Sequence, residues 1–572
     1  MGDRMKRMRW AAILPGLLLT SSLANAQSLA PDVTRQVDKV FEKWDKPDSP
    51  GCALGVYKDG KTIYKRGYGM ADLNDDVPIT PATVFHVASM SKQFTAASIA
   101  LLAQQGKLSL DDDVRKYIPE LPDFGQRITI RHLVHHTSGL RDQWNLLELA
   151  GWRYSLDLIT DDDVMSVMTR QKDLNFKPGE KHVYCNTGYT LMGLIVKRVS
   201  GMSLREFTTK NIFEPLGMTH THFRDDHAEI IKHDALGYEQ ESKDKPFRMS
   251  LTNFDTAGAT SLHTTVEDLQ LWDENFYHPR VGGQPFLQQM LERGKLNNGE
   301  QLDYAFGLVL GKYKGLSTVD HGGADAGYRS DLMRFPDQHF SASVLCNSAE
   351  TNPTGLVHQV ADILLAKDLK AVESTTDREA PKAISATLTA EQMVAIAGLY
   401  WNRENDGFEK ILVKDGKLLI EFGSDEVHPL KVAGESRFHI GDVPWGDQLD
   451  IHFVAATTEK PRHIEQSFGI GGKPDVFEIA TPHDPSAAEL AEYAGAYVSE
   501  EIDPVYRIVL QDGKLSLARL KHKSEILQPT VLDVFTADTG SFRFTRDANQ
   551  HISGFILNAG RIQNFRFSKK AN

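Results

Sequence analysis

Three short fragments that lie far apart in the chain are chemically complementary, and they constrain the fold more than any other feature. They read Ser-Met-Ser-Lys at 89–92, Tyr-Cys-Asn at 184–186 and His-Gly-Gly at 321–323. A serine hydroxyl is a poor nucleophile at neutral pH and needs a neighbouring group that accepts its proton. Together the fragments predict a serine acyl-transfer site, so the fold has to bring all three to one place.

The first fragment opens a predicted helix. Phe94 and Leu101 recur at helical spacing, and Gly106 supplies a stop. Ser89 and Lys92 therefore lie one turn apart on one face, near the free N–H groups and the positive end of the helix dipole. A lysine whose pKa falls through burial accepts a proton at neutral pH. Lys92 is thus the candidate proton acceptor for Ser89.

The Ser-x-x-Lys spacing alone is a weak signal. It recurs at Ser242 and Lys245, within the charged run YEQESKDKPF. No apolar helix follows this second copy, so we interpret it as a solvated loop. The other two fragments are what favour the copy at Ser89.

The second and third fragments supply groups that a substrate would meet. Tyr184 and Asn186 lie on a loop that enters the apolar helix YTLMGLIVKRVSG, where functional side chains project into a cleft. Tyr184 would relay a proton, and Asn186 would donate a hydrogen bond to a bound carbonyl. Gly322 and Gly323 follow a predicted strand and would let a substrate lie close to the backbone.

These motifs, in this order, resemble the serine β-lactamase and penicillin-binding-protein superfamily, and in particular its D-aminopeptidase branch. The resemblance covers roughly residues 30 to 365 and extends to FHVASMSKQFTAA, ITIRHLVHHTSGL, KPGEKHVYCNTGYTLMG and GYRSDLMRFPDQ. It implies an α+β fold of the β-lactamase/DD-peptidase type, in which helices flank an antiparallel sheet. Predicted strands near both chain ends and a helical pattern between about 90 and 275 suit this fold.

The resemblance also implies a role for each motif residue. Ser89 would be the acylated nucleophile, with Lys92 and Tyr184 as general base and proton shuttle. Asn186 would orient the substrate, and His321 would line the opposite wall. The backbone N–H groups of Ser89 and Ala324 would form the oxyanion hole.

The third motif departs from that of β-lactamases, which have Lys-Thr-Gly where this chain has His321-Gly322-Gly323. Histidine, with an ordinary pKa of about 6.5, is mostly neutral at physiological pH. A permanent cation that would hold a substrate carboxylate is therefore missing from this motif. Relatives with histidine here include D-aminopeptidases, esterases and other amide hydrolases, so the resemblance constrains the reaction more than the substrate.

Residues 1–26 have the pattern of a secretory signal peptide. Basic residues precede the apolar run AAILPGLLL, and Ala-Asn-Ala comes directly before Gln27. The run is too short for a membrane span and is broken by proline and glycine. We expect a secreted or periplasmic protein with no membrane span after signal removal.

The composition limits the kinds of molecule that the protein is expected to bind. The net charge of −13 argues against nucleic acid. His132, His135 and His136 share helical spacing but have no carboxylate partner, so no metal and no cofactor is expected. A small peptide, amide or ester is the expected partner, and a homodimer is compatible with the sequence.

The three cysteines, Cys52, Cys185 and Cys346, leave at least one free thiol. Cys52 and Cys346 lie in apolar runs, and we expect them to be small buried side chains. Cys185 stands between two motif residues, but no recognisable histidine signature supports a cysteine nucleophile.

A repeat follows the first domain, which we expect at 27–368 with a linker at 369–389. Ala-Gly-Leu-Tyr at 397–400 recurs as Ala-Gly-Ala-Tyr at 494–497, and Asp-Gly-Lys-Leu at 415–418 recurs at 512–515. Both matches, and that of Phe438 with Phe535, fall at one constant offset. This predicts two small antiparallel β-barrels, at 390–480 and 487–570.

The sequence therefore predicts an exported serine hydrolase that forms an acyl-enzyme at Ser89 and acts on D-amino-acid peptides or amides. One alternative is an esterase on small acyl esters. Another is a penicillin-binding sensor of cell-wall peptide or a DD-peptidase.

Overall fold

The structure, a computed structural model, describes residues 29–242, 244–369, 388–422, 426–441, 449–468 and 474–571. The expected signal peptide at 1–26 and most of the expected linker at 369–389 lie outside these residues. Within the described parts of the chain, no helix combines the length and the apolar character that crossing a membrane requires.

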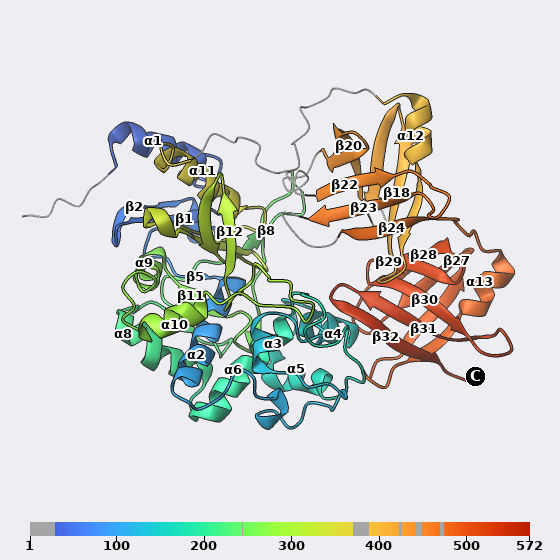
Figure 1. The fold of residues 1–572 in the computed structure, drawn as a ribbon, viewed down its shortest axis with the longest axis horizontal. Coiled ribbons are helices and arrows are strands. Elements are labelled where there is room, and N and C mark those ends of the chain that lie inside the picture. The colour runs from blue at the N-terminus through green and yellow to red at the C-terminus, as the bar shows by residue number, and fades with distance from the viewer. Residues whose placement is uncertain are drawn as a thin grey trace, which may run out of the picture.

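Strands from both ends of the first domain form one antiparallel sheet, as the sequence predicts (Figure 1). Its strand order is β12-β13-β15-β16-β1-β2, and the short strand β14 pairs with the first residues of β15. The strands are β1 (Cys52–Lys58), β2 (Lys61–Tyr68), β12 (Val309–Tyr313), β13 (Leu316–Asp320), β14 (Gly323–Asp325), β15 (Tyr328–Phe335) and β16 (Phe340–Cys346). The third motif thus lies between β13 and β14.

Helices cover both faces of this sheet. On one face, α1 (Pro31–Val40) and α11 (Pro353–Leu364) pack against β1, β15 and β16 in one apolar cluster. On the other lies α2 (Lys92–Gln104), whose side chains are buried on every side except at its last turn. A helix that is buried all round belongs at the centre of a domain, and α2 indeed packs against α6 (Asn186–Ser200) and α10 (Gly283–Met290).

Short elements surround this core. The helices are α3 (Ile130–Val134), α4 (Gln143–Leu149), α5 (Asp161–Met168), α7 (Leu204–Thr208), α8 (Glu214–Leu216) and α9 (Val266–Glu274). The strands are β3 (Met70–Asp72), β4 (Val77–Pro78), β5 (Phe85–His86), β6 (Ile159–Thr160), β7 (His222–Phe223), β8 (Tyr238–Glu239), β9 (Arg248–Met249), β10 (Phe254–Asp255) and β11 (Leu262–Thr264).

Two closed eight-stranded antiparallel barrels follow, which confirms the predicted repeat. Barrel 1 contains β17 (Gly398–Asn402), β18 (Gly407–Lys414), β19 (Lys417–Phe422), β20 (Glu426–Gly434), β21 (Arg437–Ile440), β22 (Leu449–Val454), β23 (His463–Phe468) and β24 (Asp475–Ala480). Barrel 2 contains β25 (Gly495–Val498), β26 (Tyr506–Gln511), β27 (Lys514–Ala518), β28 (Glu525–Val531), β29 (Val534–Ala537), β30 (Gly540–Arg546), β31 (Ile552–Ala559) and β32 (Ile562–Lys569).

The two barrels repeat local details as well as strand order. Each begins with a short helix, α12 (Ala390–Ile396) or α13 (Ala487–Tyr493), and each helix starts with a capping box. Asp415 and Asp512, at matching positions, both have a positive φ and open a hairpin. Asp-Gly pairs suit such turns because the glycine tolerates the second positive φ.

Barrel 2 docks on the first domain beside α4 and α5 (Figure 1). Its buried side chains continue the main apolar cluster of that domain, whereas barrel 1 has a separate core. The side chain of Arg141 is fully buried at this junction and lies 2.5 Å from the carboxylate of Glu501. It also donates to the carbonyls of Gln563 and Asn564. Because a buried charge is costly without partners, this contact specifies how barrel 2 sits.

The expectation for Cys52 and Cys346 was wrong in one respect. Both are buried, but they form a disulfide. They are directly opposite one another in the pairing of β1 with β16, so their side chains meet on the same face of the sheet. Their separation of 294 residues concealed this from the sequence. Cys185 remains a buried free thiol.

Thiol labelling tests this pairing. In denatured, unreduced protein, one thiol, that of Cys185, should be labelled, and reduction should expose all three cysteines. Replacing Cys52 and Cys346 by alanine should lower the free energy of unfolding by about 2–4 kcal/mol, measured by chemical denaturation. Labelling of all three cysteines before reduction would contradict the disulfide.

Candidate active site

The nucleophile stands on a tight turn at the entrance of α2. The 3₁₀ turn Ala88–Ser91 precedes this helix, and Ala88 has φ +48°. Ser89 is partly exposed between buried neighbours. Ser91 holds the turn: its hydroxyl donates to the Ala88 carbonyl at 2.6 Å and accepts from the N–H of Leu262 at 3.0 Å. A left-handed residue just before the serine is the kind of local strain that concentrates at functional sites.

Lys92 is held beside Ser89 with no exposed surface. Its Nζ lies 3.0 Å from Ser89 Oγ, 2.9 Å from Asn186 Oδ1 and 2.7 Å from the carbonyl oxygen of Ala259. Burial lowers the pKa of Lys92 to about 7, although the nearby carboxylate of Asp142 acts in the opposite direction. A substantial fraction of Lys92 is therefore a neutral amine at neutral pH.

The three contacts of Lys92 define what its neutral amine does. The oxygens of Asn186 and Ala259 only accept hydrogen bonds, so they take the two N–H groups of the amine. The remaining lone pair then faces the hydroxyl of Ser89. This arrangement makes Lys92 a proton acceptor for that hydroxyl.

Asn186 connects Lys92 to a carboxylate that the sequence did not single out. Asp142 Oδ2 accepts from the backbone N–H of Asn186 at 2.7 Å and from its side-chain amide at 2.9 Å. The amide is thereby oriented with its oxygen towards Lys92. In the structure Asn186 positions the lysine, and its role toward a substrate carbonyl stays a prediction. Asp142 caps the N-terminus of α4, a function that many aspartates have, so no sequence signal pointed to it.

Tyr184 closes the site above Lys92. Its ring centroid lies 4.9 Å from Lys92 Nζ. Burial raises the pKa of Tyr184 well above its ordinary value, and hydrogen bonding with Ser89 opposes this increase. The phenol is therefore protonated at neutral pH and is a donor rather than a free base.

His321 is nearly buried, with 6% of its residue surface exposed. Its Nδ1 is 2.6 Å from the carbonyl oxygen of Gly322 and its Nε2 is 3.0 Å from the hydroxyl of Tyr304. Since a carbonyl only accepts, Nδ1 carries the hydrogen and Nε2 accepts from Tyr304. Burial and the nearby Lys92 lower the pKa of His321 to about 4, so the imidazole is neutral at physiological pH.

Gly323 of the third motif serves the protein's own packing. A Cβ on Gly323 would lie 2.3 Å from the carbonyl oxygen of Val87 and 3.0 Å from Cβ of Ala88. The start of β14 is thus pressed against the turn that carries Ser89. Gly322 is half-buried with more space around it, and Ala324 is exposed. The close approach that we expected for a substrate is, at Gly323, made by the nucleophile's own turn.

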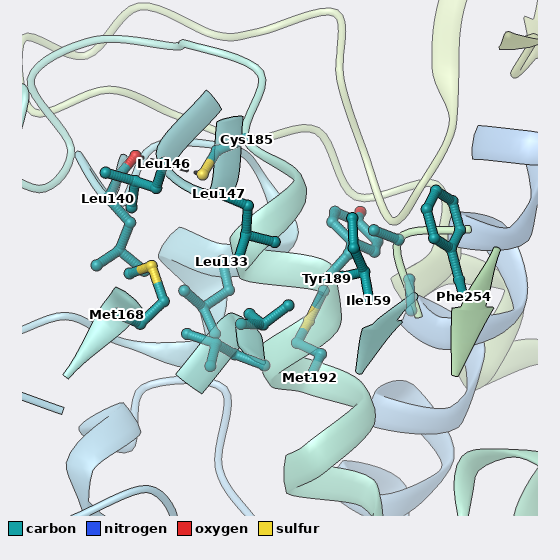
Figure 2. Close-up of a cluster of buried hydrophobic side chains, with 14 of the residues drawn as sticks. Leu133, Leu140, Leu146, Leu147, Ile159, Met168, Cys185, Tyr189, Met192 and Phe254 are labelled. Carbon is teal, nitrogen blue, oxygen red and sulfur yellow. Dashed lines mark hydrogen bonds between the residues drawn. The ribbon is translucent and has the colours of Figure 1, made fainter. Parts of the chain in front are cut away.

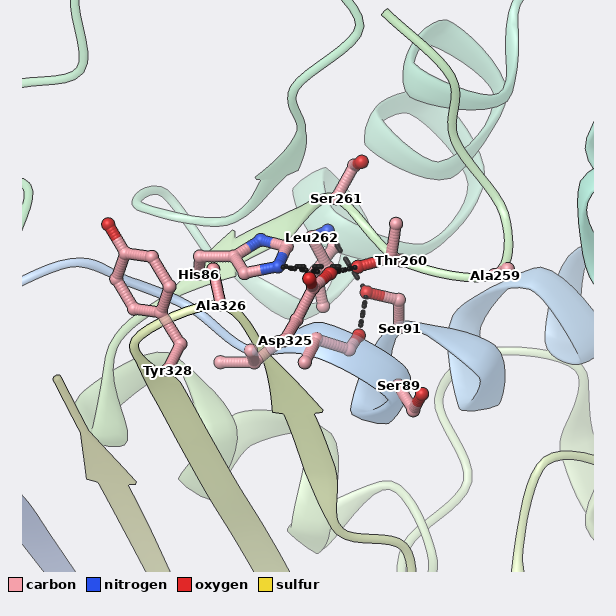
Figure 3. A network of polar contacts seen from close by, with 12 residues as sticks. His86, Ser89, Ser91, Ala259, Thr260, Ser261, Leu262, Asp325, Ala326 and Tyr328 are labelled. Carbon is pink, nitrogen blue, oxygen red and sulfur yellow. Dashed lines mark hydrogen bonds and ion pairs between the residues drawn. The ribbon is translucent and has the colours of Figure 1, made fainter. Parts of the chain in front are cut away.

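A buried carboxylate anchors this strand on its inner side (Figure 3). Asp325 receives hydrogen bonds from Thr260 at 2.7 Å, from His86 at 3.1 Å and from Tyr154. Burial alone would raise the pKa of Asp325, but these hydrogen bonds hold it below its usual value. These four residues come from four separate stretches of the chain, so no local pattern revealed them.

A cavity of about 360 Å³ lies next to this network, between α4 and barrel 2. Trp144, Trp152, Tyr154 and His522 line it. Tyr154 also bonds Asp325, so one residue of the cavity wall contacts the strand that follows the third motif.

Cys185 does not act as a nucleophile in this arrangement. It sits at the edge of an apolar cluster with Leu140 and Leu147 (Figure 2). Burial raises the pKa of its thiol to about 12, and its Sγ donates to the carbonyl of Leu140. The thiolate needed for attack is therefore not available.

The three histidines of the predicted 132–136 stretch turn to different partners. His132 accepts from the backbone of Thr129, His135 lies between two carbonyls, and His136 accepts from the N–H of Cys185. The structure therefore does not bring them together as ligands.

Comparison with known proteins relates the first domain to a known family. The family model described as Beta-lactamase matches residues 37–367. Penicillin-binding protein 4* of Bacillus subtilis is 29% identical over 411 residues, which cover 69% of this chain and 89% of that protein.

Two solved structures share the fold. An octameric penicillin-binding protein homologue from Pyrococcus abyssi has a TM-score of 0.54 at 23% identity, covering 78% of this chain and 100% of its own. The D-amino acid amidase of Ochrobactrum anthropi SV3, complexed with D-phenylalanine, has a TM-score of 0.50 at 22% identity, covering 59% of this chain and 99% of its own.

The state of Lys92 should govern the pH dependence of acylation. A protonated lysine cannot accept the proton of Ser89, so the acylation rate should rise with pH through about 7 and then level off. Stopped-flow release of p-nitrophenol from a small ester measures this rate. Lys92→Gln, which has no proton acceptor of comparable basicity, should be slower by at least roughly 100-fold. A rate that does not change across this pH range would contradict the assignment.

Proposed function

The chain belongs to the beta-lactamase family, and on this basis we propose that it is an exported serine hydrolase that cleaves D-amino-acid peptides or amides through an acyl-enzyme. The observation that carries the proposal is the 3.0 Å contact between Nζ of the buried Lys92 and Ser89 Oγ. A low-pKa amine beside a serine is one of the arrangements that activate a serine for nucleophilic catalysis.

In the first half-reaction, Oγ of Ser89 attacks the substrate carbonyl carbon while its proton passes to Lys92 Nζ. Collapse of the tetrahedral intermediate breaks the C–N bond of the substrate. The departing nitrogen needs a proton, which the Lys92 ammonium supplies through the Tyr184 hydroxyl. Lys92 is then neutral again, and Ser89 carries the acyl group as an ester.

In the second half-reaction, water replaces the amine. Lys92, again with Tyr184 as relay, accepts a proton from the attacking water and returns it to Ser89 Oγ as the ester bond breaks. In both halves, the N–H groups of Ser89 and Ala324 would bind the oxyanion. Ala324 is the exposed middle residue of β14 and follows Gly323, which is pressed against the nucleophile's turn.

The substrate class rests on two observations. First, the solved structure of the D-amino acid amidase shares the fold. Second, the third motif presents a neutral His321 at the position where a fixed cation would bind a β-lactam carboxylate. Amide hydrolysis therefore fits this wall better than β-lactam hydrolysis does.

Export is supported by the signal-like pattern of residues 1–26 and by the disulfide between Cys52 and Cys346. Disulfides persist in oxidising compartments such as the periplasm or the extracellular space. We therefore place the protein outside the cytoplasm.

A panel of substrates with matched variants tests the function. Wild type should turn over D-aminoacyl anilides faster than L-aminoacyl anilides, and Ser89→Ala should lose at least roughly 1,000-fold in kcat because the nucleophile is gone. Ser242→Ala is the matched control, because it removes the exposed serine of the other Ser-x-x-Lys sequence. Its activity should be unchanged.

Other outcomes of the same panel would replace the proposal. Turnover of p-nitrophenyl esters without any anilide would indicate an esterase. A burst of acylation by a chromogenic β-lactam or a peptide without turnover would indicate a penicillin-binding sensor, as the name of the Bacillus subtilis relative suggests.

A further inference from the structure

A single arginine of barrel 2 reaches the catalytic groups. Arg561 lies at the tip of the hairpin between β31 and β32, beside Gly560. Gly560 has φ +55°, and a Cβ there would lie 2.7 Å from the side-chain nitrogen of Asn145. A glycine here suits both the positive φ and the close approach of the hairpin tip to the Asn145 side chain.

The backbone of the hairpin tip is held from two sides by asparagines of the first domain. The N–H of Arg561 donates to Asn145 at 3.2 Å, and its carbonyl accepts from Asn175 at 2.9 Å. Asn175 also accepts from the N–H of Gln563 at 2.8 Å. These bonds, together with the buried Arg141, fix where the Arg561 side chain begins.

The guanidinium then lies against two groups of the active site. Its central carbon is 4.9 Å from the ring centroid of Tyr184. Its Nη1 is 3.6 Å from Oδ2 of Asp142, the same oxygen that accepts both hydrogen bonds from Asn186. A continuous series of contacts thus runs from Arg561 through Asp142 and Asn186 to Lys92.

Arg561 offsets the effect of Asp142 on the protonation of Lys92. A carboxylate close to Lys92 favours the ammonium form, which cannot accept the proton of Ser89. Asp142 is nevertheless required, because it orients Asn186 and caps α4. A positive charge on the far side of Asp142 keeps these hydrogen bonds while it reduces the field at Lys92.

Most of the other titratable groups around Lys92 are neutral and so do not offset the charge of Asp142. Tyr184, Tyr189 and Cys185 are neutral because burial raises the pKa of each. His136 and His321 are neutral because burial lowers the pKa of each. Among the charged groups near Lys92, Asp142 and Asp325 favour its protonation, and Arg561 opposes it.

We propose that Arg561 of barrel 2 is a positioning residue of the active site, which offsets the charge of Asp142 and so keeps Lys92 able to accept the proton of Ser89. This inference rests on the proposed function, since it assumes that Ser89 is acylated. It makes the docked barrel 2 a part of the catalytic apparatus rather than an appended module.

The experiment measures the pH dependence of Ser89 labelling by a fluorophosphonate in the full-length protein. This probe needs only an activated serine, whatever the natural substrate is. The acid limb is the part of the profile in which the labelling rate rises with pH. In Arg561→Gln this limb should move to higher pH by roughly 0.5 to 1 unit, because a positive charge near Asp142 and Lys92 is lost. At high pH the rate should return towards that of wild type, and Arg561→Lys should restore most of the shift.

A matched control and a double-mutant cycle separate this effect from others. Arg566→Gln removes the same charge from the same hairpin, at a side chain that is 69% exposed and faces Asp173, so it should leave the limb unmoved. Asp142→Asn keeps the shape and an acceptor oxygen, and should move the limb to lower pH. In that background, Arg561→Gln should have a smaller effect than in wild type.

An acid limb that stays in place in Arg561→Gln, with labelling slowed equally at every pH, would overturn the inference. So would an unmoved limb accompanied by a weaker preference for a peptide acid over its amide, since Arg561 would then bind a substrate carboxylate instead. Absence of labelling in wild type itself would overturn the proposed function, and this inference with it.

Discussion

The burial of Lys92 is the constraint on which the active site depends. An amine with no exposed surface loses its hydration, and the protein compensates with two obligate acceptors, Asn186 Oδ1 and the Ala259 carbonyl. Both acceptors have to be held rigidly, because a shift of either would leave a buried N–H unpaired. The remaining lone pair is then directed at Ser89. The same desolvation that makes Lys92 costly to bury lowers its pKa to about 7, so that a substantial fraction of the amine is neutral and can take a proton at pH 7.

Several buried contacts of the first domain hold the groups around this lysine in place. Asp142 orients Asn186, and Asp325 with its three donors holds β14 behind the nucleophile's turn. The close contact of Gly323 with Val87 sets the distance between the third motif and Ser89. The supporting contacts are polar and buried, so losing one partner leaves another unsatisfied. This is why distant elements act as one unit.

Barrel 2 belongs to that unit in physical terms. Its core is continuous with that of the first domain, and the ion pair between Arg141 and Glu501 is buried at the junction. The hairpin tip extends the same interface to the catalytic groups through Arg561. Barrel 1 has its own core and contacts barrel 2 through Asp406, which pairs with Arg543 and Asn558. Two copies of one fold therefore stand in different relations to the same site.

Features that depend on local pattern could be predicted from the sequence. Ser89 and Lys92 are one turn apart, so helical spacing predicted their contact, and the constant offset of the Asp-Gly hairpins predicted two barrels. Contacts between distant groups depend on how the whole chain folds, so the sequence did not reveal them. Cys52 finds Cys346 across adjacent strands, and Arg561 finds Asp142 from another domain. An aspartate that caps a helix or an arginine in a hairpin looks ordinary in sequence, because its effect depends on a neighbour that the folded chain alone supplies.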